Sequence, residues 1–276
     1  MPTFPFPKFT GGYSHDPAKP NECAQFDNVD VSRDGYSATR IPSFLLHTTG
    51  GLDGTMCTGV GRAVCPAGTA AKLLVAKSSS VYYTNINTSP NSFQLPLSRL
   101  PLSFSSFTLP SSTDDYPTYF VTMLNASFIP TVYVINLNQG GVVAWNGSSG
   151  SSAVVSGSPA NPFLGCSYNN HLYVVSSNTP NILQFSDTAN PGSWPSTNQF
   201  QIDASYGQIV ALVAQDDRLY IFTEQAILYM VGDPTTPYVG VMHPYVTCVS
   251  QSSISQFGSM CVFGPGTTTS TRWLGV

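Results

Sequence analysis

The chain has 276 residues, of which 42% are hydrophobic and only 9% are charged, and its 14 acidic and 10 basic side chains give a net charge of −4. No basic cluster occurs in the sequence, so the counterion release that drives tight nucleic-acid binding is not expected. Soluble proteins usually carry about 25% charged residues. Such scarce charge suits either a subunit buried in a larger assembly or a β protein with long neutral loops.

No stretch approaches the roughly 18 consecutive apolar residues of a membrane span. The start, residues 1–8, lacks the apolar core of a secretory signal, so we expect the protein to be made in the cytosol.

Neither a metal site nor a cofactor is predicted, because the cysteines are scattered and not clustered. The cysteines predicted to be reduced core thiols are Cys23, Cys57, Cys65, Cys166, Cys248 and Cys261.

Residues 1–40 are predicted to form an extended arm, because five prolines prevent helix formation and interrupt sheet pairing. Its apolar side chains cannot form a core alone and need a groove, on their own domain or on a neighbouring subunit. The aromatic residues expected to anchor the arm are Phe4, Phe6, Phe9 and Tyr13.

Five apolar runs recur from residue 73 onward, with starts 59, 40, 47 and 41 residues apart. They are Leu73–Ala76, Val132–Ile135, Leu172–Val175, Leu219–Phe222 and Met260–Phe263. Each is followed closely by a second run: Val81–Tyr83, Val142–Trp145, Ile182–Phe185, Ile227–Met230 and Arg272–Leu274. Two such runs separated by polar or glycine residues predict a β-hairpin.

Residues 41–276 are therefore predicted to be all-β, since no sustained helical periodicity occurs. Sheets that repeat every 40 to 50 residues favour a β-propeller, here of five to six small blades. A β-sandwich is the alternative. The long first interval leaves room for a partial additional blade around 119–123. The last unit ends without an outer strand, so a strand within 41–47 is expected to complete it.

The motif from Ser186 to Trp194 resembles the Asp-box of sialidases, a structural hairpin turn in which Ser186 and Asp187 open the turn, Gly192 permits its reversal and Trp194 packs beneath. A sialidase also needs an arginine cluster and an acidic pair. The six arginines and two glutamates are too dispersed for that.

Other candidates for chemistry are weak as well. The histidines His15, His47, His171 and His243 are far apart, and His171 falls in a predicted turn, where surface hydration is expected. Asp114–Asp115 and Asp216–Asp217 predict polar turns and not calcium sites, because further oxygen ligands are missing. Gly59 and Gly61 lack the helix and lysine of a phosphate loop. The sequence thus predicts a binding or structural protein and no enzyme.

An ordered series in the last third of the chain resembles the tail nozzle, or packaged-DNA stabilisation, proteins of short-tailed bacteriophages. The series consists of 185–187, 191–194, Asp203, 207–212, 217–222, 226–232, 252–254 and 260–263. The resemblance implies a propeller-containing virion protein that assembles as a hexamer beneath the portal and its adaptor ring. It also implies that the protein extends the DNA channel without specific DNA contacts, helps to retain the genome and carries tail fibres.

Two other functions remain open. In a carbohydrate-binding propeller, Trp145, Trp194 and Trp273 would stack on sugars, although they do not share one repeat position. An inactive, glycosidase-like propeller is the third possibility.

Overall fold

The computed structural model describes residues 29–31, 38–40, 57–63, 71–86, 105–114, 116–147, 150–215, 217–257, 260–263 and 274–275. The chain divides into two compact units, residues 1–53 and 54–276, whereas the sequence predicted a boundary after residue 40. In the first unit, strands β1 (Val29–Val31) and β2 (Ala38–Arg40) pair antiparallel within the segment predicted to be an arm. Phe4, Phe6, Phe9, Tyr13 and the expected closing strand within 41–47 lie outside the described residues.

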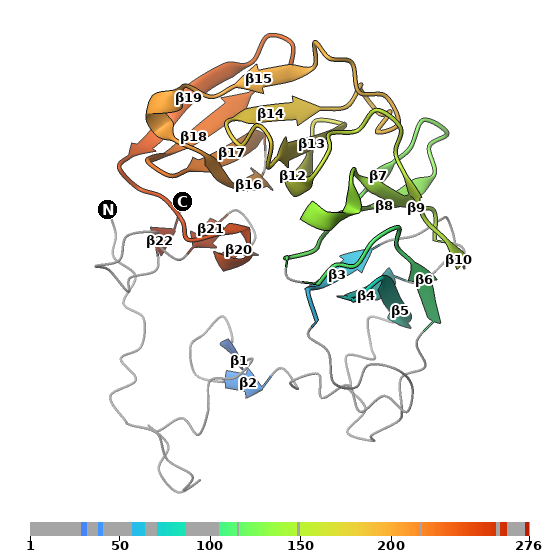
Figure 1. Cartoon of the computed structure of the whole chain (residues 1–276). Helices are drawn as coiled ribbons and strands as arrows, with labels where there is room; N and C mark the ends of the chain where they lie inside the picture. The colour runs from blue at the N-terminus through green and yellow to red at the C-terminus, as the bar shows by residue number, and fades with distance from the viewer. Residues whose placement is uncertain are drawn as a thin grey trace, which may run out of the picture. The chain divides into compact units, whose positions relative to one another are not determined.

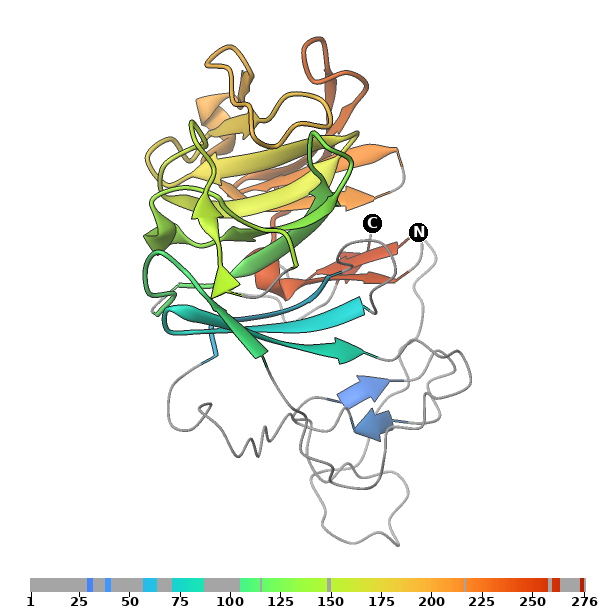
Figure 2. The same cartoon turned by 90° about the vertical axis from the view of Figure 1, so that its right-hand side faces the viewer.

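The second unit contains five sheets that follow one another in chain order (Figure 1). The first sheet is built from β3 (Gly59–Ala63), β4 (Ala71–Lys77), β5 (Ser80–Ile86), β6 (Ser105–Thr108) and β10 (Gly150–Ser151). The second is built from β7 (Tyr119–Leu124), β8 (Pro130–Ile135), β9 (Val143–Trp145) and β11 (Ala153–Val154). Figure 2 shows strands of the first sheet side by side.

The third sheet contains β12 (Pro162–Tyr168), β13 (His171–Ser176), β14 (Ile182–Phe185) and β15 (Gln199–Gln201). The fourth contains β16 (Ile209–Gln215), β17 (Arg218–Thr223), β18 (Ala226–Val231) and β19 (Tyr238–Pro244). The fifth contains β20 (Ile254–Phe257), β21 (Met260–Phe263) and β22 (Leu274–Gly275).

The predicted all-β class is confirmed. Across the described ranges, helical geometry is limited to three short 3-10 turns, η1 (Leu137–Gln139), η2 (Ala204–Tyr206) and η3 (Gln251–Ser253). Four predicted hairpins are present, as the pairs β4–β5, β8–β9, β13–β14 and β17–β18. In the fifth, β21 pairs with Leu274–Gly275, while Arg272 and Trp273 lie outside the described residues. The register follows the apolar runs, since Tyr173 lies opposite Phe185 and Tyr220 opposite Tyr229.

The segment 119–123 is not an additional blade, which corrects one expectation. It lies in β7, the first strand of the second sheet, which pairs with β8 from Tyr119 to Leu124. The long first interval also contains β6, which lies between β5 and β10 in the first sheet. In the last sheet, the described strands are β20, β21 and β22.

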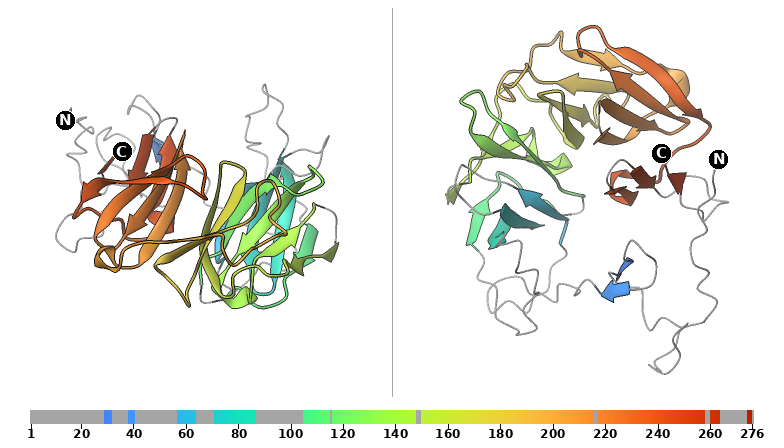
Figure 3. Two further views of the ribbon diagram at one scale, coloured as in Figure 1. Left: turned by 90° about the horizontal axis from the view of Figure 1, so that it is seen from above. Right: turned by 180° about the vertical axis from the view of Figure 1, so that it is seen from behind.

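The first strands of successive sheets lie side by side: β3 beside β7, β7 beside β12, β12 beside β16, and β16 beside η3 at the start of the fifth sheet (Figure 3). Each sheet therefore packs on the sheets before and after it. This placement explains why the apolar runs are continuous and do not alternate, because both faces of a middle sheet are covered. In β13, Leu172 and Val174 face the second sheet, while Tyr173 and Val175 face the fourth.

Aromatic side chains fill the space between the first and second sheets. The Trp145 ring is stacked on Phe107 with centroids 4.3 Å apart, and the Tyr83 centroid lies 4.8 Å from it. Trp145 is 1% exposed, so it cannot stack on a sugar. Its indole is part of the core.

Gly59 and Gly61 have a packing role. A Cβ atom on Gly59 would lie 2.1 Å from the carbonyl oxygen of Thr118, and one on Gly61 would lie 2.6 Å from the Phe120 ring. Thr118 precedes β7 and Phe120 belongs to it, so these glycines allow β3 to approach β7 closely. The third sheet uses the same device, because a Cβ on Gly165 would collide with Ile135 of the second sheet.

Candidate functional site

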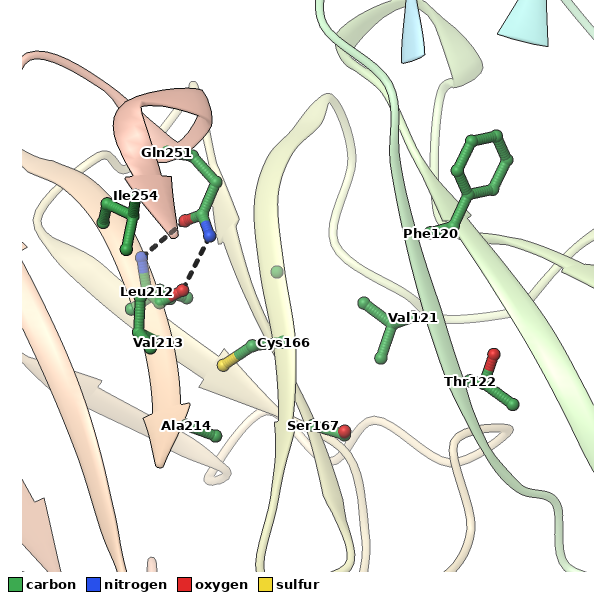
Figure 4. Close-up of a pocket in the computed structure, with 11 residues that line it drawn as sticks. Phe120, Val121, Thr122, Cys166, Ser167, Leu212, Val213, Ala214, Gln251 and Ile254 are labelled. Atoms are coloured by element: carbon green, nitrogen blue, oxygen red, sulfur yellow. Dashed lines mark hydrogen bonds between the residues drawn. The ribbon is translucent and has the colours of Figure 1, made fainter. Parts of the chain in front are cut away.

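Strands β7, β12 and β16, together with η3 and β20, line a cavity of about 310 Å³ (Figure 4). Val121 of β7 points toward β12, which contributes Cys166 and Ser167, and Val213 of β16 and Gln251 of η3 also belong to the lining. Thr122 points away from β12, and its buried hydroxyl has no hydrogen-bond partner among the described atoms. Burial raises the pKa of the Cys166 thiol to about 12. The lining is therefore uncharged at neutral pH, which suits packing more than acid–base chemistry.

Gln251 connects the fifth sheet to the fourth at this cavity. Its Oε1 accepts a hydrogen bond from the Leu212 backbone N–H at 2.6 Å, and its Nε2 donates to the Leu212 carbonyl oxygen at 2.8 Å (Figure 4). Leu212 lies on β16, whose other edge pairs with β17. A side-chain amide thus satisfies the two backbone groups on the inner edge of this strand, as a neighbouring strand would.

A second cavity, of about 410 Å³, lies where β7, β12 and β16 begin. Its lining is mainly apolar and includes Tyr119, Phe163 and Val210. Several of its residues are accessible, among them Tyr116, which is 41% exposed, and Val249, which is 65% exposed. This opening is suited to an apolar side chain of a partner more than to a charged ligand.

Asn136 fixes the loop that lines the second cavity. It is fully buried, and its Nδ2 donates to the Tyr116 carbonyl oxygen and to Thr118 Oγ1, both at 3.0 Å. Its Oδ1 accepts from the Asn138 N–H at 2.9 Å. The Thr118 hydroxyl also bonds to Thr58 Oγ1 at 3.0 Å. This network connects the segment before β3 to the loop before β7. Sequence analysis missed Gln251, because its partner Leu212 is 39 positions away, and missed Asn136, because most of its partners lie about 20 positions earlier in the chain.

The predicted hairpin turn at 186–194 is held by its polar side chains. Asp187 accepts hydrogen bonds from Ser193 Oγ at 2.6 Å and from Asn198 Nδ2 at 2.9 Å. Ser186 is fully buried, and its Oγ accepts from the Leu172 N–H at 3.0 Å. The Trp194 indole donates to the Pro191 carbonyl oxygen at 2.8 Å and packs against the core between the second and third sheets. The four predicted residues therefore form one compact structural turn.

The left-handed position of this turn is Ala189. Gly192 does not adopt a left-handed backbone conformation, whereas Ala189 does, with φ +52°. The Ala189 N–H donates to the Asn170 carbonyl oxygen at 2.7 Å. This contact with the β12–β13 turn fixes the conformation of Ala189.

His171 is buried, with 5% exposure, which corrects its expected hydration. It begins β13 directly after the Asn169–Asn170 turn, and its side chain points to the 186–194 turn. Its Nδ1 lies 2.6 Å from the Ser186 carbonyl oxygen and its Nε2 lies 3.2 Å from Thr188 Oγ1. The imidazole therefore joins two turns of one sheet.

Asp114 and Asp217, the described aspartates of the two predicted polar turns, each contact a polar side chain close to them in the sequence. Asp114 accepts a hydrogen bond from Ser112 Oγ at 2.6 Å, and Asp217, 78% exposed, lies 3.5 Å from Arg218 Nε. Among the residues that the structure describes, no group of three potential metal ligands occurs. Nor does any helix in those ranges have the length and apolar character needed to cross a membrane.

Comparisons with known proteins give similarities of structure only. No family model and no curated protein matches the chain. It is similar to PorZ, a bacterial surface component of the type-IX secretion system of Porphyromonas gingivalis, with 13% identity, a TM-score of 0.42, and coverage of 76% of this chain and 24% of that one. It is also similar to the extracellular domain of the putative hybrid two component system BT4673 from B. thetaiotaomicron, with 17% identity, a TM-score of 0.48, and coverage of 84% and 27%. The chain spans about a quarter of each of these proteins.

Proposed function

We propose that the five sheets are blades of a β-propeller and that the chain is a structural protein of a short-tailed phage tail. The observation that carries the first part is the order of the first strands, β3, β7, β12, β16 and then η3, each beside the next. In a propeller the first strand of every blade is the innermost, so successive first strands are neighbours. A sandwich needs no such series.

The virion role rests on the resemblance and on what its residues do in the fold. The resembling series begins with the 186–194 turn of the third sheet and continues through β16, β17 and β18 of the fourth. The four faces between successive sheets are filled by separate apolar clusters. Because each sheet packs closely on the next, the protein is a stiff scaffold. Such a scaffold suits a structural role in which the protein acts by binding its neighbours.

In this role the protein forms a hexameric ring in the virion tail, below the portal and adaptor. The ring extends the DNA channel, helps to retain the genome and anchors tail fibres. DNA passes without specific binding, in agreement with the low and slightly negative net charge. The arm with Phe4, Phe6 and Phe9 reaches the adaptor or a neighbouring subunit.

The test measures particle mass by native mass spectrometry and electron microscopy, for the full chain alone and with the portal and adaptor proteins of the same phage. We expect a hexamer on the portal complex. A variant lacking residues 1–20 should stay folded and fail to join the particle. A chain that remains monomeric and unbound with the portal complex present would contradict the proposal.

A further inference from the structure

The outer part of the fourth sheet carries a surface made by Arg218, Tyr229 and Tyr238, from three adjacent strands. Tyr229 lies opposite Tyr220 on β17 and opposite Gly240 on β19. Because side chains two residues apart share a face, Arg218 and Tyr238 lie on the same face as Tyr229, diagonally to either side. We call these three residues the tyrosine surface.

Tyr229 contacts both of the other side chains. The Arg218 guanidinium lies 5.4 Å from the centroid of the Tyr229 ring, within the range of a cation–π interaction. The Tyr229 and Tyr238 centroids are 5.9 Å apart. A hydrogen bond to Tyr238 raises the pKa of the Tyr229 phenol. The surface is therefore pre-arranged, and little ordering would be needed on binding.

Gly240 holds the Tyr229 ring in place. A Cβ atom on Gly240 would lie 2.6 Å from the ring and from its hydroxyl oxygen, so the ring lies directly against the backbone of β19. Tyr238 is 65% exposed and the Arg218 side chain is 44% exposed. Farther along the same face, Phe222 and Ile227 are buried in the cluster with the fifth sheet. Among the described residues of this face, Arg218 and Tyr238 at the end with the tyrosine surface are accessible.

The chemistry of this surface fits a neutral sugar. A pyranose with equatorial hydroxyls presents C–H bonds on its ring faces, and these pack on the electron-rich face of an aromatic ring. Its hydroxyls need neighbouring donors and acceptors, which the Arg218 guanidinium and the Asp217 carboxylate supply. The two charges are paired at 3.5 Å and cancel formally. An acidic ligand therefore gains no net attraction.

We propose that the tyrosine surface binds neutral hexose glycans, with a pyranose ring stacked on Tyr238. This is an additional binding activity and does not depend on the proposed role in a phage tail. It also differs from the sugar binding first considered for the tryptophans, because Trp145 is buried.

The test begins with the full chain on a glycan array containing neutral and acidic glycans. The best neutral glycan is then titrated and followed by saturation-transfer difference NMR. We expect millimolar or tighter binding, and a loss of at least about fivefold in affinity for Tyr238→Ala. Gly240→Ala should weaken binding without removing any ring, because the new methyl group displaces Tyr229. Circular dichroism checks that both variants remain folded.

Tyr245→Ala is the matched control, because Tyr245 is 88% exposed and follows the far end of β19. It should bind like the unaltered chain. The proposal would be overturned if the chain binds no neutral glycan on the array, or binds acidic glycans alone. Equal glycan affinities of the Tyr238→Ala variant and the unaltered chain would have the same meaning. Loss of particle incorporation by Tyr238→Ala without any glycan binding would also overturn it and would assign the surface to a protein partner.

Discussion

The side-chain amide of Gln251 is hydrogen-bonded to both backbone groups of Leu212, its N–H at 2.6 Å and its carbonyl oxygen at 2.8 Å. The two residues are 39 positions apart, in η3 and β16. Among the described strands β16 pairs with β17 alone, so at its other edge the amide connects the fourth sheet to the fifth through backbone groups. Few other side chains could offer a donor and an acceptor in this geometry.

Replacing Gln251 with alanine should lower the free energy of unfolding by about 1–3 kcal/mol, because the part-buried N–H and carbonyl of Leu212 lose their partner. Urea denaturation followed by tryptophan fluorescence measures the change. Gln201→Ala is the control, since Gln201 is exposed on β15, and it should change stability by less than about 0.5 kcal/mol. Equal effects would mean that the amide bonds contribute nothing.

Replacing Asn136 with leucine should cost about 2–4 kcal/mol. The substitution leaves the Asn138 N–H and the Tyr116 carbonyl without this partner inside a buried network. The loop with Tyr116 should also loosen, which limited proteolysis followed by mass spectrometry would detect as new cleavage near residue 116. Asn138→Ala removes a single exposed bond, to the Asp114 carbonyl oxygen at 3.0 Å, and should have little effect. A stable, protease-resistant Asn136→Leu variant would refute this role.

Substitutions at Ala189 and Gly192 test which residue of the 186–194 turn needs a left-handed backbone. Ala189→Gly should stabilise the protein by about 0.5 kcal/mol, because glycine adopts a positive φ without the steric cost that alanine has. Gly192→Ala should be nearly neutral, since its new Cβ would meet only Asn190 Oδ1, at 3.2 Å. Thermal unfolding of the two variants distinguishes this from the sequence-based expectation, which requires Gly192→Ala to be the damaging change.

Cys166 should resist alkylation in the native state. Its pKa of about 12 leaves about a thousandfold less thiolate at pH 8 than an ordinary thiol has. Peptide mapping after timed iodoacetamide treatment should find exposed Cys57 labelled first and part-exposed Cys166, at the cavity wall, labelled much more slowly. Labelling of native Cys166 as fast as that of Cys57 would contradict the raised pKa.

The same pKa shift gives a stability change with a definite sign. Between the ordinary thiol pKa of about 8.5 and the native value of about 12, the unfolded chain binds fewer protons than the native one, so stability falls as pH rises. Denaturation at pH 8 and pH 10.5 should therefore show the unaltered chain losing stability relative to Cys166→Ala. A pH-independent difference between the two would argue against a buried protonated thiol.

The hairpins of the fold could be predicted because each apolar run is local. The runs at 172–175 and 182–185 could be paired from the sequence alone. A shift of one residue in their register would move every side chain to the opposite face of its strand. The segment 119–123 was assigned wrongly, because its partner strand begins only at residue 130 and its place in a sheet depends on the previous sheet ending at β6. Short outer strands such as Ala153–Val154 have no sequence pattern of their own.

The site residues divide in a similar way. Ser186, Asp187 and Trp194 were found because their partners lie within a dozen residues or in the adjacent hairpin. The burial of His171 was not predicted. The sequence places this residue beside the 169–170 turn but does not show that the 186–194 turn packs over its side chain. The contact of Arg218 with Tyr229 could not be predicted without the register of β17 against β18, which is evident only when both strands are aligned.

The parallel pairing of β10 with β6 has a consequence for synthesis on the ribosome. Gly150 and Ser151 complete the first sheet, and Ser152 Oγ donates to the Thr108 carbonyl oxygen at 2.6 Å. These residues follow β7, β8 and β9, all of which belong to the second sheet. The first sheet therefore gains its last strand only after most of the second has emerged, so the two sheets are expected to mature as one co-translational unit.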